Sequence, residues 1–530
     1  MENLAREGGR ISTPPESRMS RQIKIASLIW GASILASRLV GLVREMVLGR
    51  VLGTSGAADV YMASFVLPDF LNYLLAAGAL SIVYIPIFNG YLSRGEERQA
   101  WESFSAIASP LLVALVAGVG ALWVAVPWLT WIIAPGFPGA DAEHLVYLTR
   151  IILPAQIFHV FGGLLSATLQ ARDRHALPAL APLLYTAAVI AGGLIGGSAE
   201  GFAWGVLAGS ALGPFAIPLA GNRRLGLTFR FTWRWRHPDL ATYLRRSLPI
   251  MLGFSIVVVD DWIAVREASL VSEGAVAAIR YAKNLLRVPM GIFGMAAGVA
   301  AFPTLTRLVA AGRSDDAYRT LSSAVRTVLV LALGSQVVLT VAGPEISEVL
   351  YGSRIDADQH RLIGWSLALL GVGLWAWAAQ TLVSRGFYAI GRTWPPTTVG
   401  TIIAAMAYPL YVVLRHRWGV LGLSAATSIA VSVYIGILVI VLRRSFPGVP
   451  DRYGEFALRI LPALLAGVLT GWAVRAGVGG PAILRGGAAA VAGGGAYVLV
   501  GLLVGPPDVR RLTGMFTSRV RRTRPASASS

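Results

Sequence analysis

Charged side chains interrupt an apolar stretch at residues 24–49 that is long enough to cross a bilayer. A spanning helix needs about 20 apolar residues, and a charge at its centre costs about 2.5–3.5 kcal/mol on insertion scales. Ser37-Arg38 and Arg44-Glu45 both lie inside this stretch. Charges in such positions usually face a water-filled cavity and bind something there. The pattern is therefore typical of a membrane transporter with a charged central cavity.

A second group of charges lies in the other half of the chain. Arg280, Lys283 and Arg287 are spaced i, i+3 and i+7, which predicts one basic stripe on one helix face. A basic stripe that lines a cavity would hold an anion, because guanidinium groups match the geometry of phosphate and carboxylate. Asp260 and Asp261 precede the stripe and are candidates for an ion-coupling site, although no complete set of cation ligands accompanies them.

Two other interpretations of these charges stay open. Arg50, Asp69 and Arg287 could lie at helix ends and extend to the lipid headgroups. Arg44-Glu45 and Arg266-Glu267 could be structural ion pairs that hold two lobes together. The same charges therefore predict either a binding site or a set of structural contacts.

The segment with the first charges recurs in the second half of the chain. Residues 31–48 match residues 253–270, so that Arg44-Glu45 recurs as Arg266-Glu267, 222 residues later. Structural repeats with a binding site at their interface are the common plan of secondary transporters. The spacing between the two copies predicts two parallel, pseudo-symmetric lobes.

The composition predicts an all-α polytopic membrane protein. Of the 530 residues, 55% are hydrophobic and only 14% are charged, which exceeds the apolar fraction of ordinary soluble domains. The apolar runs predict about fourteen transmembrane helices, including an eleventh at 396–414 and a twelfth at 419–442.

The loop charges predict the orientation. Loops rich in arginine alternate with loops nearly free of Lys and Arg, and an even number of spans puts both termini on the arginine-rich, cytoplasmic side. Arg415 and Arg417 lie on the opposite side, which makes the eleventh and twelfth spans the least secure.

Several chemistries are excluded. The chain has no cysteine, and its six histidines show no metal-ligand spacing, so no metal site and no cofactor are expected. The net charge of +19 comes from arginines in short loops, and the stretch 230–237 resembles a membrane-interface anchor more than a nucleic-acid site. No phosphate-binding Gly-rich loop with Lys-Ser/Thr is present, so nothing suggests ATP hydrolysis.

Several motifs resemble the MurJ (MviN) family of lipid II flippases, part of the multidrug/oligosaccharidyl-lipid/polysaccharide exporter superfamily. The most specific motif runs from Ser37-Arg38-Leu-Val-Gly41-Leu-Val-Arg44-Glu45 through Asp59 and Leu67-Pro68 to Pro86. Further agreement is found at Ala134-Pro135-Gly136-Phe137 and at Gly386-Phe387-Tyr388-Ala389. The resemblance covers nearly the whole chain.

The resemblance implies two six-helix lobes and two C-terminal helices that form a groove for a polyprenyl tail. The implied segments are a cytoplasmic tail 1–22, an N-lobe 23–222, a basic and aromatic linker 223–243, a C-lobe 244–445, C-terminal helices 446–505, and a basic cytoplasmic tail 506–530.

The resemblance also implies the substrate-binding residues. Matched motifs and charged positions give the candidate substrate-binding set Ser37, Arg38, Arg44, Asp59, Asn72, Lys283, Asn284 and Arg287. Two positions depart from the family pattern, because an arginine is replaced by Asn72 and an Asp-Arg pair by Lys283-Asn284. A lysine is a point charge and cannot form the forked contact of arginine with pyrophosphate, so the identity of the glycan stays open.

The implied function is a lipid flippase of the bacterial inner membrane that acts as a monomer with lipid II and membrane lipids as partners, driven by the membrane potential or a cation gradient. No bond is made or broken in this process. The alternatives are a flippase for another polyprenyl-pyrophosphate-linked glycan, a drug or cation antiporter of the same superfamily, a membrane-embedded glycosyl or phosphoglycosyl transferase, and a scaffold without transport activity.

Overall fold

The computed structural model describes residues 36–76, 83–234, 236–251, 256–446, 448–450 and 452–514. The predicted tail 1–22, the beginning of the apolar stretch at 24–49, and the end of the tail 506–530 lie outside the described residues. The described part is helical and contains no β-strand, which confirms the all-α fold class.

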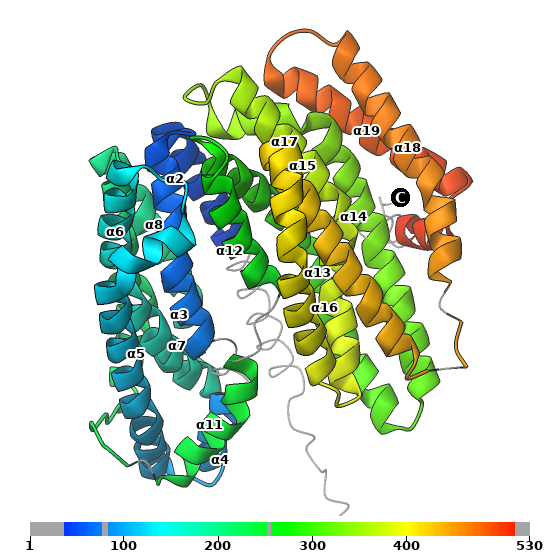
Figure 1. The fold of residues 1–530 in the computed structure, drawn as a ribbon. Helices are drawn as coiled ribbons and strands as arrows, with labels where there is room; N and C mark the ends of the chain where they lie inside the picture. The colour runs from blue at the N-terminus through cyan, green and yellow to red at the C-terminus, as the bar shows by residue number, and fades with distance from the viewer. Residues whose placement is uncertain are drawn as a thin grey trace, which may run out of the picture.

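The first half of the chain forms one group of packed helices, coloured blue to cyan in Figure 1. They are helix 36–52, α2 (Gly56–Ala63), α3 (Val66–Ala76), α4 (Ile85–Leu92), α5 (Glu97–Ile133), α6 (Gly139–Ile152), α7 (Ala155–Ala171), α8 (Ala176–Gly196), α9 (Ala199–Ser210), the π-helix η2 (Ala211–Ala216) and α10 (Ile217–Arg223).

The second half forms a second group beside the first, coloured green to orange in Figure 1. It contains α12 (Ile256–Ser269), α13 (Ala275–Ala310), α14 (Ser314–Tyr351), α15 (Ala357–Val372), α16 (Leu374–Ala389) and α17 (Trp394–Arg443). In sequence, α11 (Pro238–Met251) lies between the two groups. In space it packs against α3 and α5 of the first group. The predicted C-lobe begins at residue 244, within this helix.

A glycine divides α17 into two segments. Gly419 has φ +55°, in the left-handed region that glycine adopts without steric cost. At Gly422 a Cβ atom would lie 2.0 Å from the carbonyl oxygen of Leu414, so the chain also turns too tightly for a side chain there. The break lies between the apolar runs predicted at 396–414 and 419–442.

The described residues do not confirm the predicted number of spans. Among the described residues, eight helices are long and apolar enough to cross a membrane, or nine if the bent pair α15 and α16 counts as one span. The count of fourteen is therefore not confirmed. The short helices α2 and α3 do not each reach the length of a span, because a turn at residues 64–65 separates them.

The C-terminal helices α18 (Tyr453–Gly477) and α19 (Ala482–Leu503) pack on each other and on α14. Their contact depends on small residues, since a Cβ at Gly467 would lie 2.9 Å from the carbonyl oxygen of Gly493. In Figure 1 this pair lies at the edge of the molecule, on the far side of α14 from the first group. The two central groups therefore face each other without the C-terminal pair between them.

Candidate functional site

A cavity of about 270 Å³ lies between the two groups of helices. Its first-half residues come from helix 36–52, from the region of α2 and α3, and from α8, and its second-half residues come from α13. The lining residues are Arg44, Glu45, Leu48, Tyr61, Met62, Phe65, Asp69, Tyr185, Arg280, Asn284 and Arg287. The cavity is thus built at the predicted place, between two halves of the chain.

Cationic side chains outnumber acidic ones in this lining. Arg44, Arg280 and Arg287 face two carboxylates, those of Glu45 and Asp69. Arg44 Nη2 lies 2.6 Å from Glu45 Oε1, which confirms that these neighbours form an ion pair. An ion pair beside a cavity stabilises the arginine in a fixed position while part of its guanidinium stays exposed, at 33% of the side chain. The lining therefore has a cationic excess that suits an anionic ligand.

A hydrogen bond joins the two halves across the cavity. Asn284 Nδ2 donates to Glu45 Oε2 over 2.7 Å, and Arg287 Nη1 donates to Asn284 Oδ1 over 3.2 Å. The Arg44–Glu45 pair in the first half is thereby connected to α13 in the second half. Both groups of helices thus contribute to one polar network.

Behind this lining lies a second, more deeply buried network. Lys283 Nζ is 2.6 Å from Asp260 Oδ2 and 3.0 Å from Asp261 Oδ1, and only 6% of the lysine side chain is exposed. Asp261 also accepts from Arg287 over 2.5 Å, and Tyr411 donates to Asp260. The two candidate ion-coupling carboxylates are therefore bound to the ammonium group of the chain itself.

The basic stripe of α13 divides between these two networks. The residues that line the cavity are Arg280, Asn284 and Arg287, spaced i, i+4 and i+7, while Lys283 contacts the aspartates of α12. Positions i+3 and i+4 lie on either side of residue i, separated by about 100° around the helix. The spacing in the sequence could not decide whether Lys283 at i+3 or Asn284 at i+4 points into the cavity.

Besides Lys283, four predicted substrate-binding residues lie outside the cavity lining. Ser37 and Arg38 belong to helix 36–52, and a Cβ at Gly291 of α13 would lie 2.7 Å from Arg38 Nη1. Asn72 Nδ2 donates to Gln156 Oε1 over 2.9 Å, within the first group of helices. Arg38 therefore lies against the second half of the chain, whereas Asn72 packs inside the first half.

The fourth of these residues, Asp59, closes one end of the interface between the halves. Its Oδ2 accepts from the backbone N–H of Gly274, and its Oδ1 from that of Ala277, both over 2.7 Å. In the reverse direction, Gly56 N–H at the start of α2 donates to Glu273 Oε1 over 2.8 Å. Each half thus supplies a carboxylate to the helix N-terminus of the other half.

Contacts of α12 with the end of α5, the loop after it and α17 add to the closure at this end. Arg266 Nη1 donates to the carbonyl oxygen of Ile132 over 3.1 Å, and Gly136 N–H donates to Ser269 Oγ over 3.3 Å. Glu267 pairs with Arg415 at 2.9 Å and with Arg266 at 3.6 Å. The Arg266-Glu267 copy of the repeat is therefore structural, whereas the Arg44-Glu45 copy lines the cavity.

Sequence reasoning did not find the aromatic lining. Tyr61 and Tyr185 come from helices that are far apart in sequence, and neither is among the predicted site residues. Tyr185 is in an apolar helix whose sequence gives no signal for a ligand site. Asp69, for which the sequence leaves a headgroup contact open, lies in the lining of the central cavity.

The fold and the cavity together define a polytopic membrane transporter built from two halves. A solved structure of lipid II flippase MurJ in an inward closed conformation matches with a TM-score of 0.74 at 18% identity, over 93% of this chain and 99% of that one. An inward-facing multidrug resistance MATE family transporter matches with a TM-score of 0.62 at 16% identity, over 77% and 94% of the two chains. At these identities the likeness shows the fold alone.

Sequence comparison identifies the family. The family model described as lipid II flippase MurJ matches residues 48–476. A probable lipid II flippase MurJ of Rhizobium tropici is 27% identical over 526 residues, which cover 94% of this chain and 97% of the relative. A lipid II flippase MurJ of Burkholderia cenocepacia is 26% identical over 371 residues, covering 67% and 71%. The chain therefore belongs to the lipid II flippase MurJ family, as its motifs predicted.

Proposed function

We propose that this protein moves lipid II across the bacterial inner membrane, from the cytoplasmic to the periplasmic leaflet. Family membership and the polytopic fold support this function. The observation that carries it is the cationic lining of the cavity between the halves, where Arg44, Arg280 and Arg287 lie around one space. Guanidinium groups on facing helices can form forked contacts with the oxygens of a pyrophosphate.

Movement of the lipid requires the cavity to open alternately to the two sides of the membrane. In the conformation described here, Asp59 and Glu273 join the N-terminal ends of α2 and α13. Opening at this end would break these bonds, and water would then satisfy the freed N–H groups. We propose that these bonds are made and broken once in each transport cycle.

The membrane orientation is part of the same proposal. The alternation of arginine-rich and arginine-poor loops puts both termini in the cytoplasm. The end closed by Asp59 and Glu273 would then face the periplasm. Exposed tryptophans near the end of α5, Trp128 and Trp131, are 66% exposed each and suit a membrane interface at that end.

The energy source in this proposal is the membrane potential. Cationic side chains of α13 already pair with both buried carboxylates, Lys283 with Asp260 and Asp261 and Arg287 with Asp261, so resident cations take the place of an exchangeable one. The potential acts on any displaced charge with about 2.3 kcal/mol per unit charge per 100 mV. The excess of arginine in the cavity provides charge that such a field can act on.

The test is rescue of a bacterial strain depleted of its own lipid II flippase. Wild-type protein should restore growth, and the Arg44→Ala and Arg287→Ala variants should not, although they insert in the membrane. Arg98→Ala is the matched control, since Arg98 is 92% exposed on α5 and pairs only with Glu102 among the described residues. Failure of the wild-type protein to restore peptidoglycan synthesis at normal membrane levels would refute the proposal.

A second candidate is a flippase for another polyprenyl-pyrophosphate-linked glycan. The cationic lining would bind the pyrophosphate of either lipid, and Asn72 and Lys283 depart from the family pattern. Proteoliposomes that contain lipid II or a polyprenyl-pyrophosphate-linked glycan without peptide separate the two cases. Protection of only the second lipid from an external headgroup-modifying reagent would favour this candidate.

A further inference from the structure

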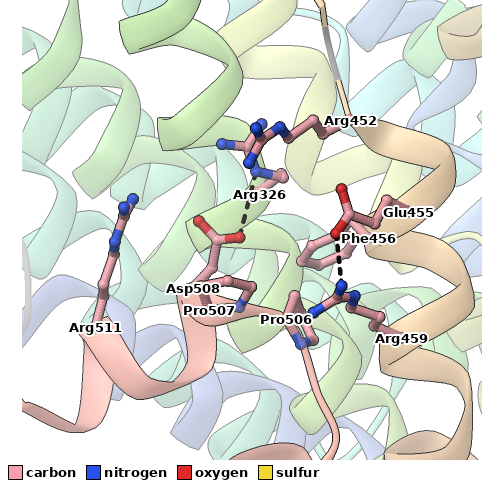
Figure 2. Close-up of a pocket in the computed structure, with 9 residues that line it drawn as sticks. All are labelled: Arg326, Arg452, Glu455, Phe456, Arg459, Pro506, Pro507, Asp508 and Arg511. Atoms are coloured by element: carbon pink, nitrogen blue, oxygen red, sulfur yellow. Dashed lines mark hydrogen bonds and ion pairs between the residues drawn. The ribbon is translucent and has the colours of Figure 1, made fainter.

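A second basic pocket lies away from the central cavity, where α14, α18 and the segment after α19 meet (Figure 2). Residues 507–514 are helical and are anchored by Val509 and Leu512, whose side chains are 3% and 8% exposed. This anchoring holds the chain after α19 in place beside the first turn of α18. The pocket is therefore formed by three ordered segments.

Arginines dominate the pocket. Its lining contains four arginines and two carboxylates. Both carboxylates already have a cationic partner, because Arg326 Nε lies 3.3 Å from Asp508 Oδ2 and Arg459 Nη2 lies 2.9 Å from Glu455 Oε1. Arg452 and Arg511 make no ion pair with any residue that the structure describes. Two guanidinium groups are thus available for an anion.

The backbone adds to the positive potential of the pocket. Arg452 is the N-cap residue of α18, and its side chain does not cap the helix. Its backbone is left-handed, with φ +52°, a conformation that costs a non-glycine residue about 1–3 kcal/mol. The backbone N–H groups of Gly454 and Glu455 in the first turn of α18 make no hydrogen bond among the described residues, and a helix N-terminus beside arginines favours negative charge.

The location suits a membrane lipid. The pocket lies at the beginning of α18 and just after the end of α19, two helices that are long and apolar enough to span the bilayer. Exposed apolar side chains continue from it along both helices, with Leu458 at 76% and Leu503 at 66% exposure. Basic pockets between spanning helices at the cytoplasmic surface recognise anionic headgroups.

We propose that this pocket binds a phosphate group, held by Arg452 and Arg511 with the first turn of α18. Arg326, with 15% of its side chain exposed, would remain paired with Asp508 and support the site from beneath. The phosphate belongs either to an anionic membrane phospholipid or to a soluble phosphate compound. This site is separate from the central cavity and does not depend on the transported lipid.

The experiment measures binding of three ligands to the purified full-length protein in a non-ionic detergent. Native mass spectrometry is performed with phosphatidylglycerol, with phosphatidylcholine and with inorganic phosphate. We expect phosphatidylglycerol to bind at least about tenfold more tightly than phosphatidylcholine, because forked arginine contacts favour an anionic headgroup. Binding of inorganic phosphate alone would support the site and identify a soluble source.

Variants connect the binding to this pocket. Arg452→Gly removes the guanidinium and keeps the left-handed backbone favourable, and Arg511→Gln removes an exposed charge. The double variant should bind phosphatidylglycerol or phosphate at least about tenfold less tightly. The control Arg98→Ala removes one positive charge from α5, far from the pocket in sequence, and should bind like the wild type.

Two results overturn the proposal. One is a double variant that binds both anionic ligands as tightly as the wild type. The other is a wild-type protein that shows no preference for phosphatidylglycerol over phosphatidylcholine and no binding of phosphate. If the double variant proves unstable, the binding measured for Arg511→Gln alone decides, since Arg511 is exposed and makes no ion pair with a described residue.

Discussion

Asn284 Nδ2 donates a hydrogen bond to Glu45 Oε2 over 2.7 Å, and this bond joins α13 to helix 36–52 across the central cavity. The same Glu45 accepts from Arg44 through its other oxygen, over 2.6 Å. An amide can bridge the two halves without adding charge to the cavity. A ligand phosphate that displaced Glu45 from Arg44 would at the same time weaken this bridge, which connects binding with the relative position of the halves.

The first prediction concerns the cationic lining. Arg44→Ala should abolish rescue of a flippase-depleted strain, because hydrogen bonds to a charged group contribute about 1.5–3 kcal/mol and their loss lowers ligand affinity roughly tenfold or more. Arg44→Lys should rescue only in part, since an ammonium cannot form a forked contact. Growth after depletion and membrane abundance are measured together. Full rescue by Arg44→Ala would show that this residue does not bind the substrate.

The second prediction concerns the buried charge network. Lys283→Met should lower the free energy of unfolding by about 3–5 kcal/mol, because Asp260 would stay buried without a cationic partner, while Asp261 would keep its ion pair with Arg287. Adding Asp260→Asn to this variant should recover part of the loss. Thermal unfolding in detergent provides the measurement, with Arg98→Ala as the control.

The same variant tests whether Lys283 takes the place of a coupling cation. Without the ammonium group, Asp260 and Asp261 should bind Na⁺, and the melting temperature of Lys283→Met should rise with sodium concentration. The wild-type melting temperature should change no more with sodium than with choline. An equal response of both proteins to sodium would show that the ammonium does not occupy a cation site.

The third prediction concerns the closed end of the interface. Asp59→Asn should remove one of the two bonds to α13, because the amide NH2 cannot accept a hydrogen bond, at a cost of about 1.5–3 kcal/mol, and should favour the conformation that is open at this end. The chain contains no cysteine, so Met62→Cys places a single thiol in the cavity lining. The rate of its labelling by a membrane-impermeant reagent from the Asp59 side should increase.

A matched control separates this effect from a general loss of charge. Asp358→Asn removes an exposed carboxylate that pairs with Arg361 at 3.2 Å, and it should leave the labelling rate of Met62→Cys unchanged. Equal labelling in the Asp59→Asn and Asp358→Asn backgrounds would mean that Asp59 does not hold this end closed.

The fourth prediction concerns the attachment of the C-terminal helices. Glu345 is 1% exposed, and its Oε1 accepts from Arg475 of α18 and Arg485 of α19, each over 2.8 Å. Glu345→Ala should therefore destabilise the packing of both helices on α14 by about 1.5–3 kcal/mol, since the two arginines left behind are partly exposed to solvent. Faster proteolysis between α17 and α18 should report the change. Glu348→Ala, which removes a half-exposed carboxylate 3.6 Å from Arg485, should have little effect.

The sequence predicted a charged cavity between the halves, because a charge inside an apolar span is stable only where it faces a polar space or a partner. Arg44-Glu45 within a span had to face a polar space, and it lines the central cavity. Asn284 and Arg287 also lie there, so three of the eight predicted substrate residues belong to the lining. The predicted beginning of the C-lobe, residue 244, lies inside α11, and this helix packs on the first half of the chain.

The amino-acid sequence by itself determined that the protein is an all-α membrane protein of the lipid II flippase MurJ family, because hydrophobic length, buried charge and motif spacing are local properties of the chain. Tertiary structure alone decided which charges meet. It paired Lys283 with the aspartates of α12 and turned Arg280 into the cavity, and it joined Asp59 to backbone N–H groups more than 200 residues away. Such contacts depend on helix rotation and packing between distant segments, and these follow from the whole fold.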